Sequence, residues 1–257
     1  MSAGPAPKRK FGQNFLVDEN VLGVVGRLAE LDPDDVVLEI GPGLGVLTRF
    51  LAERVSLVHA VEIDRTLEPH LPALDNLRLH FGDALRLDLA ALEPPPGKLV
   101  SNLPYNIATP LVAESLAGLP AVDSWCVMVQ REVADRFFAA PSTKAYGAVS
   151  VLVQLAAERT GFHPVSREVF RPRPNVDSAL VAFSRRGPLP EPWPWIKRVV
   201  EGAFAHRRKT LPNSLQLAGI AERGRAAAAL AAIGRDASTR AEALAPDEFV
   251  ALTEELA

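Results

Sequence analysis

The stretch Asn102-Leu103-Pro104-Tyr105 places an amide, a proline and an aromatic ring directly after the apolar run Lys98 to Ser101. The Asn102 side chain and the Leu103 carbonyl offer two neighbouring hydrogen-bond acceptors. Pro104 restricts the turn, and Tyr105 supplies a flat face. Two acceptors beside an aromatic plane suit a planar base with an exocyclic amino group. Taken alone, however, the four residues are better explained as a strand that ends in an Asn-Pro-type turn, so the surrounding sequence decides.

Three other apolar runs also end in glycines or acids. Residues 36–40 run into the turn 41–45, whose three glycines let the backbone approach a ligand at a helix N-terminus. Residues 56–63 carry Glu62 near their end, and residues 76–81 are followed by Asp83. Because parallel strands present their carboxyl ends at one edge of a sheet, we expect these groups to meet at a single ligand site.

The details of this site favour S-adenosylmethionine over a dinucleotide. The glycines follow a G-x-G-x-G spacing without the continuation typical of dinucleotide sites, and Glu39 precedes Gly41 by two residues, where it suits water or a ligand amino group. Glu62 could accept hydrogen bonds from both ribose hydroxyls. Asp83 could accept one from an adenine amino group, with the Ala84 N–H available to a ring nitrogen.

The composition limits the classes of function. The chain has 257 residues, 48% hydrophobic and 23% charged, with a formal net charge of −3, which argues against a protein that coats nucleic acid over its whole surface. The single Cys126 excludes an intrachain disulfide, and the five histidines show no metal-ligand spacing. With no secretory signal and no run of membrane-spanning length, the sequence predicts a cytoplasmic protein without a metal or membrane partner.

Alternation of strands and helices predicts an α/β fold with a doubly wound, Rossmann-like sheet. The expected strands are residues 36–40, 56–63, 76–81, 98–101, 124–130 and 178–184, and helices are expected at 46–54, 109–116, from 130 onward and at 148–157. Asp18 is expected to cap a helix, with the residues before it as a short lid. A Pro-rich linker at 187–192 divides a catalytic domain, 1–186 with a flexible basic tail at 1–10, from a small α-helical domain, 187–257.

With Asn102 to Tyr105 added, the chain closely resembles the ribosomal RNA adenine N6-dimethyltransferases, the KsgA (RsmA) family, over nearly its whole length. The order and spacing of the matching blocks make chance a poor explanation. These blocks are GQNFLVD (12–18), LEIGPGLGVLT (38–48), VEID (61–64), GDAL (82–85), NLPYNIATP (102–110), MVQREVADR (128–136), VFRPRPNVDSALV (169–181) and AHRRKTLPNSL (205–215).

The resemblance implies specific site residues. It assigns the target adenine to Asn102, Leu103, Pro104 and Tyr105, with Phe170 on the other face of the base. Together with the interpretation of the strand ends, it gives this set of expected cofactor contacts: Gln13, Asn14, Leu16, Glu39, Gly41, Gly43, Glu62, Asp83, Ala84 and Asn102.

The resemblance also implies an RNA partner. The family substrate is a pair of adjacent adenosines in the 3′-terminal hairpin of 16S rRNA within an immature small ribosomal subunit, and we expect a monomeric enzyme with a C-terminal RNA-docking domain. One departure is the loop after Phe170, where Arg173 replaces the middle residue of a three-proline run and Asn175 follows. The expected RNA contacts are Lys8, Arg9, Lys10, Arg171, Arg173, Arg207, Arg208 and Lys209.

Three alternatives stay open at this stage. The first is an adenine-N6 methyltransferase that acts on large-subunit rRNA or DNA. The second is a non-catalytic ribosome-assembly factor with a relic site, against which the intact Glu62, Asp83 and Asn102 to Tyr105 argue. The third is a nicotinamide-dependent dehydrogenase, which the glycine spacing disfavours.

Overall fold

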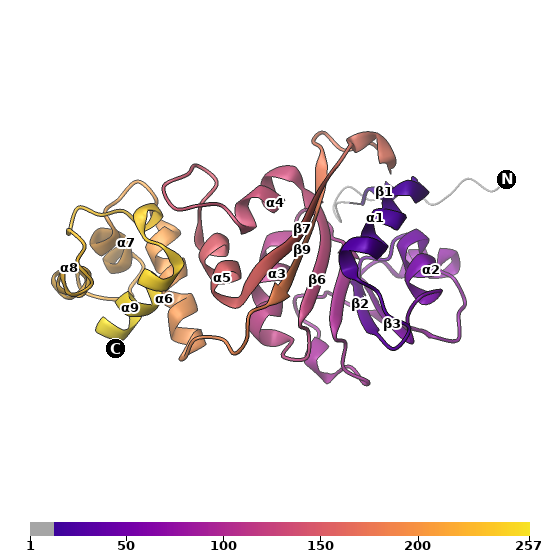
Figure 1. Ribbon diagram of the computed structural model, residues 1–257, viewed down its shortest axis with the longest axis horizontal. Helices are drawn as coiled ribbons and strands as arrows, with labels where there is room; N and C mark the ends of the chain where they lie inside the picture. The colour runs from indigo at the N-terminus through magenta and orange to yellow at the C-terminus, as the bar shows by residue number, and fades with distance from the viewer. Residues whose placement is uncertain (1–12) are drawn as a thin grey trace. The chain divides into compact units, whose positions relative to one another are not determined.

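The computed structural model describes residues 13–257, so the predicted tail with Lys8, Arg9 and Lys10 lies outside the described residues (Figure 1). The chain divides into two compact units: residues up to 134 with 159–185, and residues 135–158 with 186–257. The division by sequence placed residues 135–158 in the catalytic domain. They group instead with the C-terminal helices, because the apolar helix α5 (Ala148–Ala156) packs against α6 (Trp193–Ala205) and α9 (Pro246–Glu255).

A seven-stranded sheet with the order β4-β3-β2-β5-β6-β9-β7 forms the core of the first unit (Figure 1). Its five parallel strands are β2 (Val36–Ile40), β3 (Leu57–Glu62), β4 (Leu77–Phe81), β5 (Lys98–Asn102) and β6 (Ser124–Gln130). The strand β9 (Ser178–Arg185) pairs antiparallel with β6. The predicted α/β fold is therefore confirmed, as a mixed rather than purely parallel sheet.

The edge strand β7 (Ala157–Val165) was not predicted from the sequence. Most of its side chains are exposed or half-buried, so it lacks the continuous apolar run that marks the inner strands. It also follows α5 without an intervening turn signal. Sequence patterns therefore gave no cue to separate it from the helix.

Helices cover both faces of this sheet. The helices α1 (Glu19–Ala29) and α2 (Val46–Ala52) pack on the face that carries Cys126, which is buried as expected in the same apolar cluster. Side chains alternate along a strand, so the neighbouring Trp125 points to the opposite face, where its Nε1 donates to Ser115 Oγ of α3 (Ala108–Gly118) at 3.0 Å. Asp18 caps α1 as predicted, since its side chain accepts a hydrogen bond from the Asn20 backbone N–H.

A separate two-stranded ribbon joins β1 (Phe15–Leu16) to β8 (Phe170–Arg171) in antiparallel pairing. Leu16 pairs with Phe170, and the Val17 N–H donates to the Val169 carbonyl at 2.9 Å. The segment predicted as a short lid before α1 is thus tied to a loop more than 150 residues later in the chain.

The second unit is helical, as predicted for the C-terminal region. Besides α5, α6 and α9 it contains α7 (Leu211–Leu217), α8 (Arg223–Ala232) and the end of α4 (Arg131–Phe137). Aromatic contacts from Phe204 to Tyr146 and to Phe249 form part of its core. No helix within residues 13–257 is long and apolar enough to cross a membrane.

Candidate functional site

A cavity of about 300 Å³ opens at the carboxyl ends of β2, β3, β4 and β5, within the size range of small-molecule sites. The structure brings all the expected cofactor residues into its lining: Gln13, Asn14, Leu16, Glu39, Gly41, Gly43, Glu62, Asp83, Ala84 and Asn102. Leu103, Pro104 and Tyr105 line the same cavity.

The glycine turn provides one wall of the cavity. Gly43 has a φ of 59°, and a Cβ there would lie 2.9 Å from the Phe15 ring, so only glycine fits without a shift. Glu62 accepts the Gly43 N–H at 3.3 Å through Oε2 and the Asp64 N–H at 2.8 Å through Oε1. Burial raises the pKa of Glu62, while these backbone N–H groups oppose the shift. The acid expected at the ribose therefore also holds the turn in place.

Glu39 is a buried acid without a full set of partners. It is 1% exposed, and its Oε2 finds no hydrogen-bond partner among the described residues. Burial raises the pKa of Glu39 to about 8, with the negative charge of Glu62 adding to the rise and the nearby Thr48 hydroxyl opposing it. A buried, unpaired carboxyl oxygen that lines a cavity suits a ligand that brings a cationic or N–H donor.

The segment 13–16 closes over the cavity. Gln13 Nε2 donates to Asp64 Oδ2 at 3.2 Å, and Asn102 Nδ2 donates to the Asn14 carbonyl at 3.2 Å. Phe15 contacts the glycine turn as described, and Leu16 is buried. The lid is thereby attached to three of the strand ends that form the site.

Asp83 and Ala84 form the wall at the end of β4. Asp83 Oδ1 accepts the Leu85 N–H at 3.0 Å, and its Oδ2 lies 3.6 Å from Arg86 Nε in a solvent-exposed pair. The Asp83 side chain remains 37% exposed, so its carboxylate is accessible from the cavity. This arrangement leaves acceptor capacity for an amino group of a ligand.

The two proposed acceptors are held by their backbone neighbours. Ser101 Oγ donates to the Ile40 carbonyl at 2.6 Å and accepts the Ile40 N–H at 3.2 Å, which fixes β5 to β2 one residue before Asn102. The Leu103 N–H donates to the Met128 carbonyl at 3.0 Å. No group in residues 13–257 donates to the Leu103 carbonyl. The Asn102 N–H₂ contacts Asn14, so its Oδ1 also remains available as an acceptor.

The two aromatic residues differ in what they can contact. Tyr105 is half-buried at the cavity, and its hydroxyl lies 2.6 Å from Ser178 Oγ. Phe170, expected on the other face of the target base, is 0% exposed and belongs to the apolar cluster with α1 and Leu16. The structure contradicts that expectation, because pairing of β8 with β1 turns the Phe170 side chain into the core.

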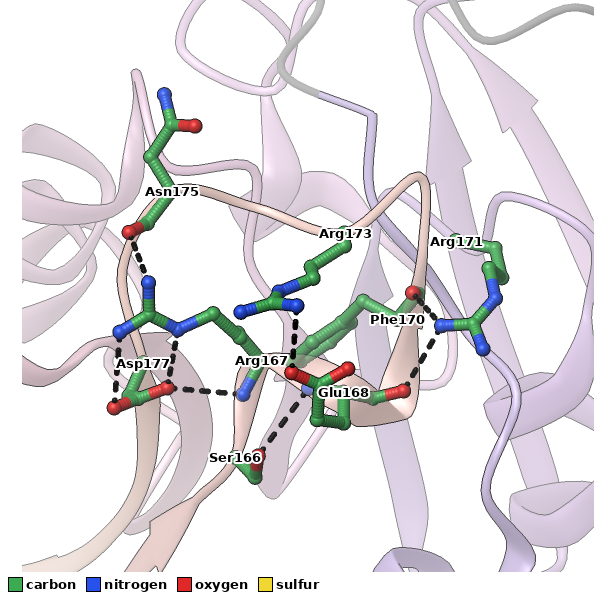
Figure 2. Close-up of polar contacts among 8 residues, drawn as sticks. All are labelled: Ser166, Arg167, Glu168, Phe170, Arg171, Arg173, Asn175 and Asp177. Carbon is green, nitrogen blue, oxygen red and sulfur yellow. Dashed lines mark hydrogen bonds and ion pairs between the residues drawn. The ribbon is translucent and has the colours of Figure 1, made fainter.

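Two of the expected RNA-binding cations, Arg171 and Arg173, lie on an exposed loop between residues 166 and 177 (Figure 2). Arg171 Nη1 donates to the Glu168 and Phe170 carbonyls, and Arg173 pairs with Glu168 Oε1 at 2.9 Å. Both guanidinium groups remain near the surface. Exposed contacts of this kind contribute little to stability, so an anion such as phosphate can displace them and bind the two guanidinium groups.

In the second unit, Arg207 differs from its two neighbours. Its Nη2 donates to the Tyr146 carbonyl at 3.0 Å and the Lys144 carbonyl at 3.3 Å, and lies 3.6 Å from Glu242. Arg208 and Lys209 are exposed, and none of the described ion pairs includes them. Arg207 thus also holds its own unit together, while its side chain remains about half exposed and its expected RNA contact stays a prediction.

Sequence reasoning missed several residues that shape the site. Phe15 packs on Gly43, Ser101 fixes two strand ends, Asp64 holds Gln13, and Ser178 holds Tyr105. Phe15 and Asp64 fall within blocks of the family resemblance, which is the one signal that could have marked them. Ser178 likewise falls within the block 169–181, whereas Ser101 lies outside all the blocks and carries no pattern of its own.

The chain is similar to known proteins over almost its whole length. A family model described as "Ribosomal RNA adenine dimethylase" matches residues 6–257. The ribosomal RNA small subunit methyltransferase A of Rubrobacter xylanophilus is 50% identical over 252 residues, 96% of this chain and 94% of that protein.

Two solved structures resemble the chain over most of its length. A dimethyladenosine transferase from Plasmodium falciparum has a TM-score of 0.74 at 22% identity and covers 93% of this chain and 95% of its own, which shows a shared fold. The 23S rRNA methyltransferase ErmE has a TM-score of 0.64 at 30% identity, and covers 95% of this chain and 99% of its own.

Proposed function

We propose, since the chain belongs to the ribosomal RNA adenine dimethylase family, that it transfers methyl groups from S-adenosylmethionine to the N6 atoms of adenines in small-subunit rRNA. The observation that carries this proposal is the pair of free acceptors at Asn102 and Leu103, beside Tyr105, in the wall of the cavity at the strand ends. The 50% identity with a small-subunit rRNA methyltransferase supports this choice of rRNA.

The residues around the cavity fit the expected cofactor. Glu39 offers an unpaired buried oxygen to an amino group, Glu62 offers carboxylate oxygens to ribose hydroxyls, and Asp83 with the Ala84 N–H suits an adenine edge. Gly43 lines the same cavity, and its missing side chain lets the Phe15 ring of the segment 13–16 pack on the glycine turn beside the ligand space. When bound, S-adenosylmethionine supplies an activated methyl group on a positively charged sulfur.

The chain's own contribution to the reaction is orientation of the amine. The lone pair of an adenine amino nitrogen is delocalised into the ring, so the nitrogen is a poor nucleophile. Hydrogen bonds from its N–H groups to Asn102 Oδ1 and the Leu103 carbonyl favour a pyramidal nitrogen whose lone pair points at the donor. The same acceptors stabilise the positive charge that grows on nitrogen during transfer. The proton leaves after transfer, so no strong base is required.

The base must leave its stack to reach this site, at a cost of a few kcal/mol. Stacking on one aromatic face is worth ~1–3 kcal/mol, so contact with the Tyr105 ring offsets much of that cost. Because Phe170 is buried, we assign the stacking role to Tyr105 in this proposal.

The finer features of the substrate follow the family. We propose that the targets are two adjacent adenosines in the 3′-terminal hairpin of 16S rRNA in an immature small subunit, in the cytoplasm, and that the enzyme acts as a monomer. Arg171, Arg173, Arg208 and Lys209 are the described cations offered for phosphate contact. Such contacts make RNA binding weaken steeply with added salt.

The direct test is transfer of labelled methyl from S-adenosylmethionine to immature small subunits, followed by mapping of the modified bases. Purified large-subunit rRNA and DNA serve as competing substrates. The proposal predicts label at N6 of two neighbouring adenosines in small-subunit rRNA. Label confined to large-subunit rRNA would support the ErmE-like alternative, and tight RNA binding without transfer would support an assembly factor.

A further inference from the structure

The hydroxyls of Tyr105 and Ser178 lie 2.6 Å apart, although the residues are 73 positions apart in the chain. Tyr105 belongs to the turn between β5 and α3 and lines the cavity. Ser178 is 0% exposed and does not line the cavity. The bond therefore connects a ring at the site to a buried side chain behind it.

Ser178 is held firmly on the sheet. It is the first residue of β9 and pairs with Gln130, the last residue of β6. On its other side, the Asp177 carbonyl accepts the Arg131 N–H at 2.9 Å. The Asp177 carboxylate accepts Arg167 Nε at 2.9 Å and the Arg167 N–H at 3.1 Å (Figure 2). Backbone pairing and this ion pair thus fix the backbone that carries Ser178, and its hydroxyl has one torsion with which to meet the Tyr105 hydroxyl.

The Tyr105 ring, by contrast, projects from a turn. The turn itself is closed by hydrogen bonds from the Ile107 and Ala108 N–H groups to the Pro104 carbonyl, each at 3.1 Å. Those bonds fix the backbone but leave the two side-chain torsions of Tyr105 free. A hydrogen bond at the tip of the ring restricts both torsions, and therefore the plane that the ring offers to a base.

We propose that Ser178 is a positioning residue that sets the plane of the Tyr105 ring against the target adenine. This inference rests on the proposed function, because it concerns the same base-binding site. A positioning role differs from a merely structural role in one respect. Ser178 then affects activity only by its hydrogen bond to the Tyr105 hydroxyl.

The first test compares Ser178→Ala with Ser115→Ala in methyl transfer to immature small subunits. Ser115 is a buried serine of the same unit whose hydroxyl bonds Trp125 and the Val112 carbonyl, so Ser115→Ala reports the loss of a buried hydroxyl that does not contact Tyr105. Ser178→Ala should lower kcat roughly fivefold to tenfold, the change expected for one hydrogen bond. Affinity for S-adenosylmethionine should stay unchanged in both variants, and kcat should stay unchanged in Ser115→Ala.

The second test uses Tyr105→Phe and the double variant. Tyr105→Phe removes the same bond from the half-buried partner, so it should reproduce the loss in kcat, and adding Ser178→Ala should cause no further loss. A full additional loss in the double variant, or unchanged kcat in both single variants, would overturn the proposal. If the wild-type protein transfers no methyl group, the proposed function is refuted. The hydrogen bond between Ser178 and Tyr105 is then tested by the spectroscopic experiment below.

The chain has 2 tyrosines, which allows a readout independent of activity. With ¹³Cζ-labelled tyrosine, the resonance lost in Tyr105→Phe identifies Tyr105, and the other belongs to Tyr146. Ser178→Ala should shift the Tyr105 resonance and leave that of Tyr146 in place, whereas Ser115→Ala should shift neither. An unmoved Tyr105 resonance in Ser178→Ala would show that the bond does not hold the ring.

Discussion

The Asn102 side chain donates a hydrogen bond from Nδ2 to the backbone carbonyl of Asn14, at 3.2 Å and across 88 positions in the sequence. The contact uses the donor side of the amide and leaves Oδ1 for a substrate amine. It also attaches the segment 13–16, which lines the cavity at the strand ends, to the residue proposed to orient the base. The position of the segment 13–16 at the cavity and the orientation of the Asn102 acceptor are therefore linked through one side chain.

The glycine turn gives a prediction about cofactor affinity. Gly43→Ala introduces a side chain at a φ of 59° and 2.9 Å from Phe15, so either the turn or the lid must move. We expect a loss of about 1–3 kcal/mol in the free energy of unfolding and at least a tenfold loss in S-adenosylmethionine affinity. Denaturant unfolding and calorimetry measure the two effects. Gly97→Ala, where an added Cβ meets nothing within 4 Å, is the matched control and should change neither.

Glu39 predicts an unusual pH dependence of stability. The pKa of Glu39 rises from an ordinary value of 4.5 to about 8, so between these values the folded chain keeps a proton that the unfolded chain has released. Its contribution to stability is therefore fully present below pH 4.5 and is lost as the pH rises toward 8. Each unit of pKa shift corresponds to about 1.4 kcal/mol, so the loss should reach a few kcal/mol.

Urea unfolding of the wild type and of Glu39→Gln at pH 5 and pH 8 isolates this contribution. The wild type should lose more stability than the variant between the two pH values, because glutamine does not titrate. Equal losses in both proteins would mean that Glu39 is already ionised in the folded chain.

Phe170 gives a prediction that separates packing from catalysis. Its side chain is 0% exposed within the apolar cluster, so Phe170→Ala should cost about 3–5 kcal/mol of unfolding free energy. Chemical denaturation measures this loss directly. A variant of unchanged stability that fails to methylate RNA would restore the base-stacking role expected from the resemblance.

The sequence alone predicted the features that depend on hydrophobic periodicity and on the residue types at the ends of strands. It predicted the inner strands, the cap at Asp18 and the helical C-terminal region, because each depends on a local pattern. The convergence of Glu39, Glu62 and Asp83 also followed, since parallel strands end at one sheet edge.

Features that depend on long-range pairing did not follow from the sequence. Nothing local indicates that Leu16 pairs with Phe170, yet this pairing buries the ring that the resemblance assigned to the substrate. The grouping of α5 with the C-terminal helices and the clamp on Arg207 likewise arise from distant partners. Burial and hydrogen bonding of these side chains decide their roles, and neither can be read from spacing.

The cations at residues 207–209 should separate into two kinds. Arg207→Ala removes bonds to the Tyr146 and Lys144 carbonyls, so it should lower thermal stability. Arg208→Ala and Lys209→Ala should leave the Tm unchanged and weaken binding to small-subunit rRNA. The slope of log affinity against log salt should fall by about 0.7–0.9 for each phosphate that a variant no longer neutralises. Salt titrations of all three variants decide the point, and equal slopes in Arg208→Ala, Lys209→Ala and wild type would remove these two residues from the RNA surface.

The most direct test of the account measures cofactor binding and single-turnover methyl transfer in Asn102→Ala, with Asn102→Asp as comparison. Asn102→Ala loses the acceptor and the hydrogen bond to Asn14, whereas Asn102→Asp keeps an acceptor oxygen, loses the donor and adds a negative charge. We expect that Asn102→Ala still binds S-adenosylmethionine, that its transfer rate falls at least about 100-fold, and that Asn102→Asp keeps measurable transfer. Near-normal transfer in Asn102→Ala would contradict the claim that this amide presents the adenine amine to the methyl donor.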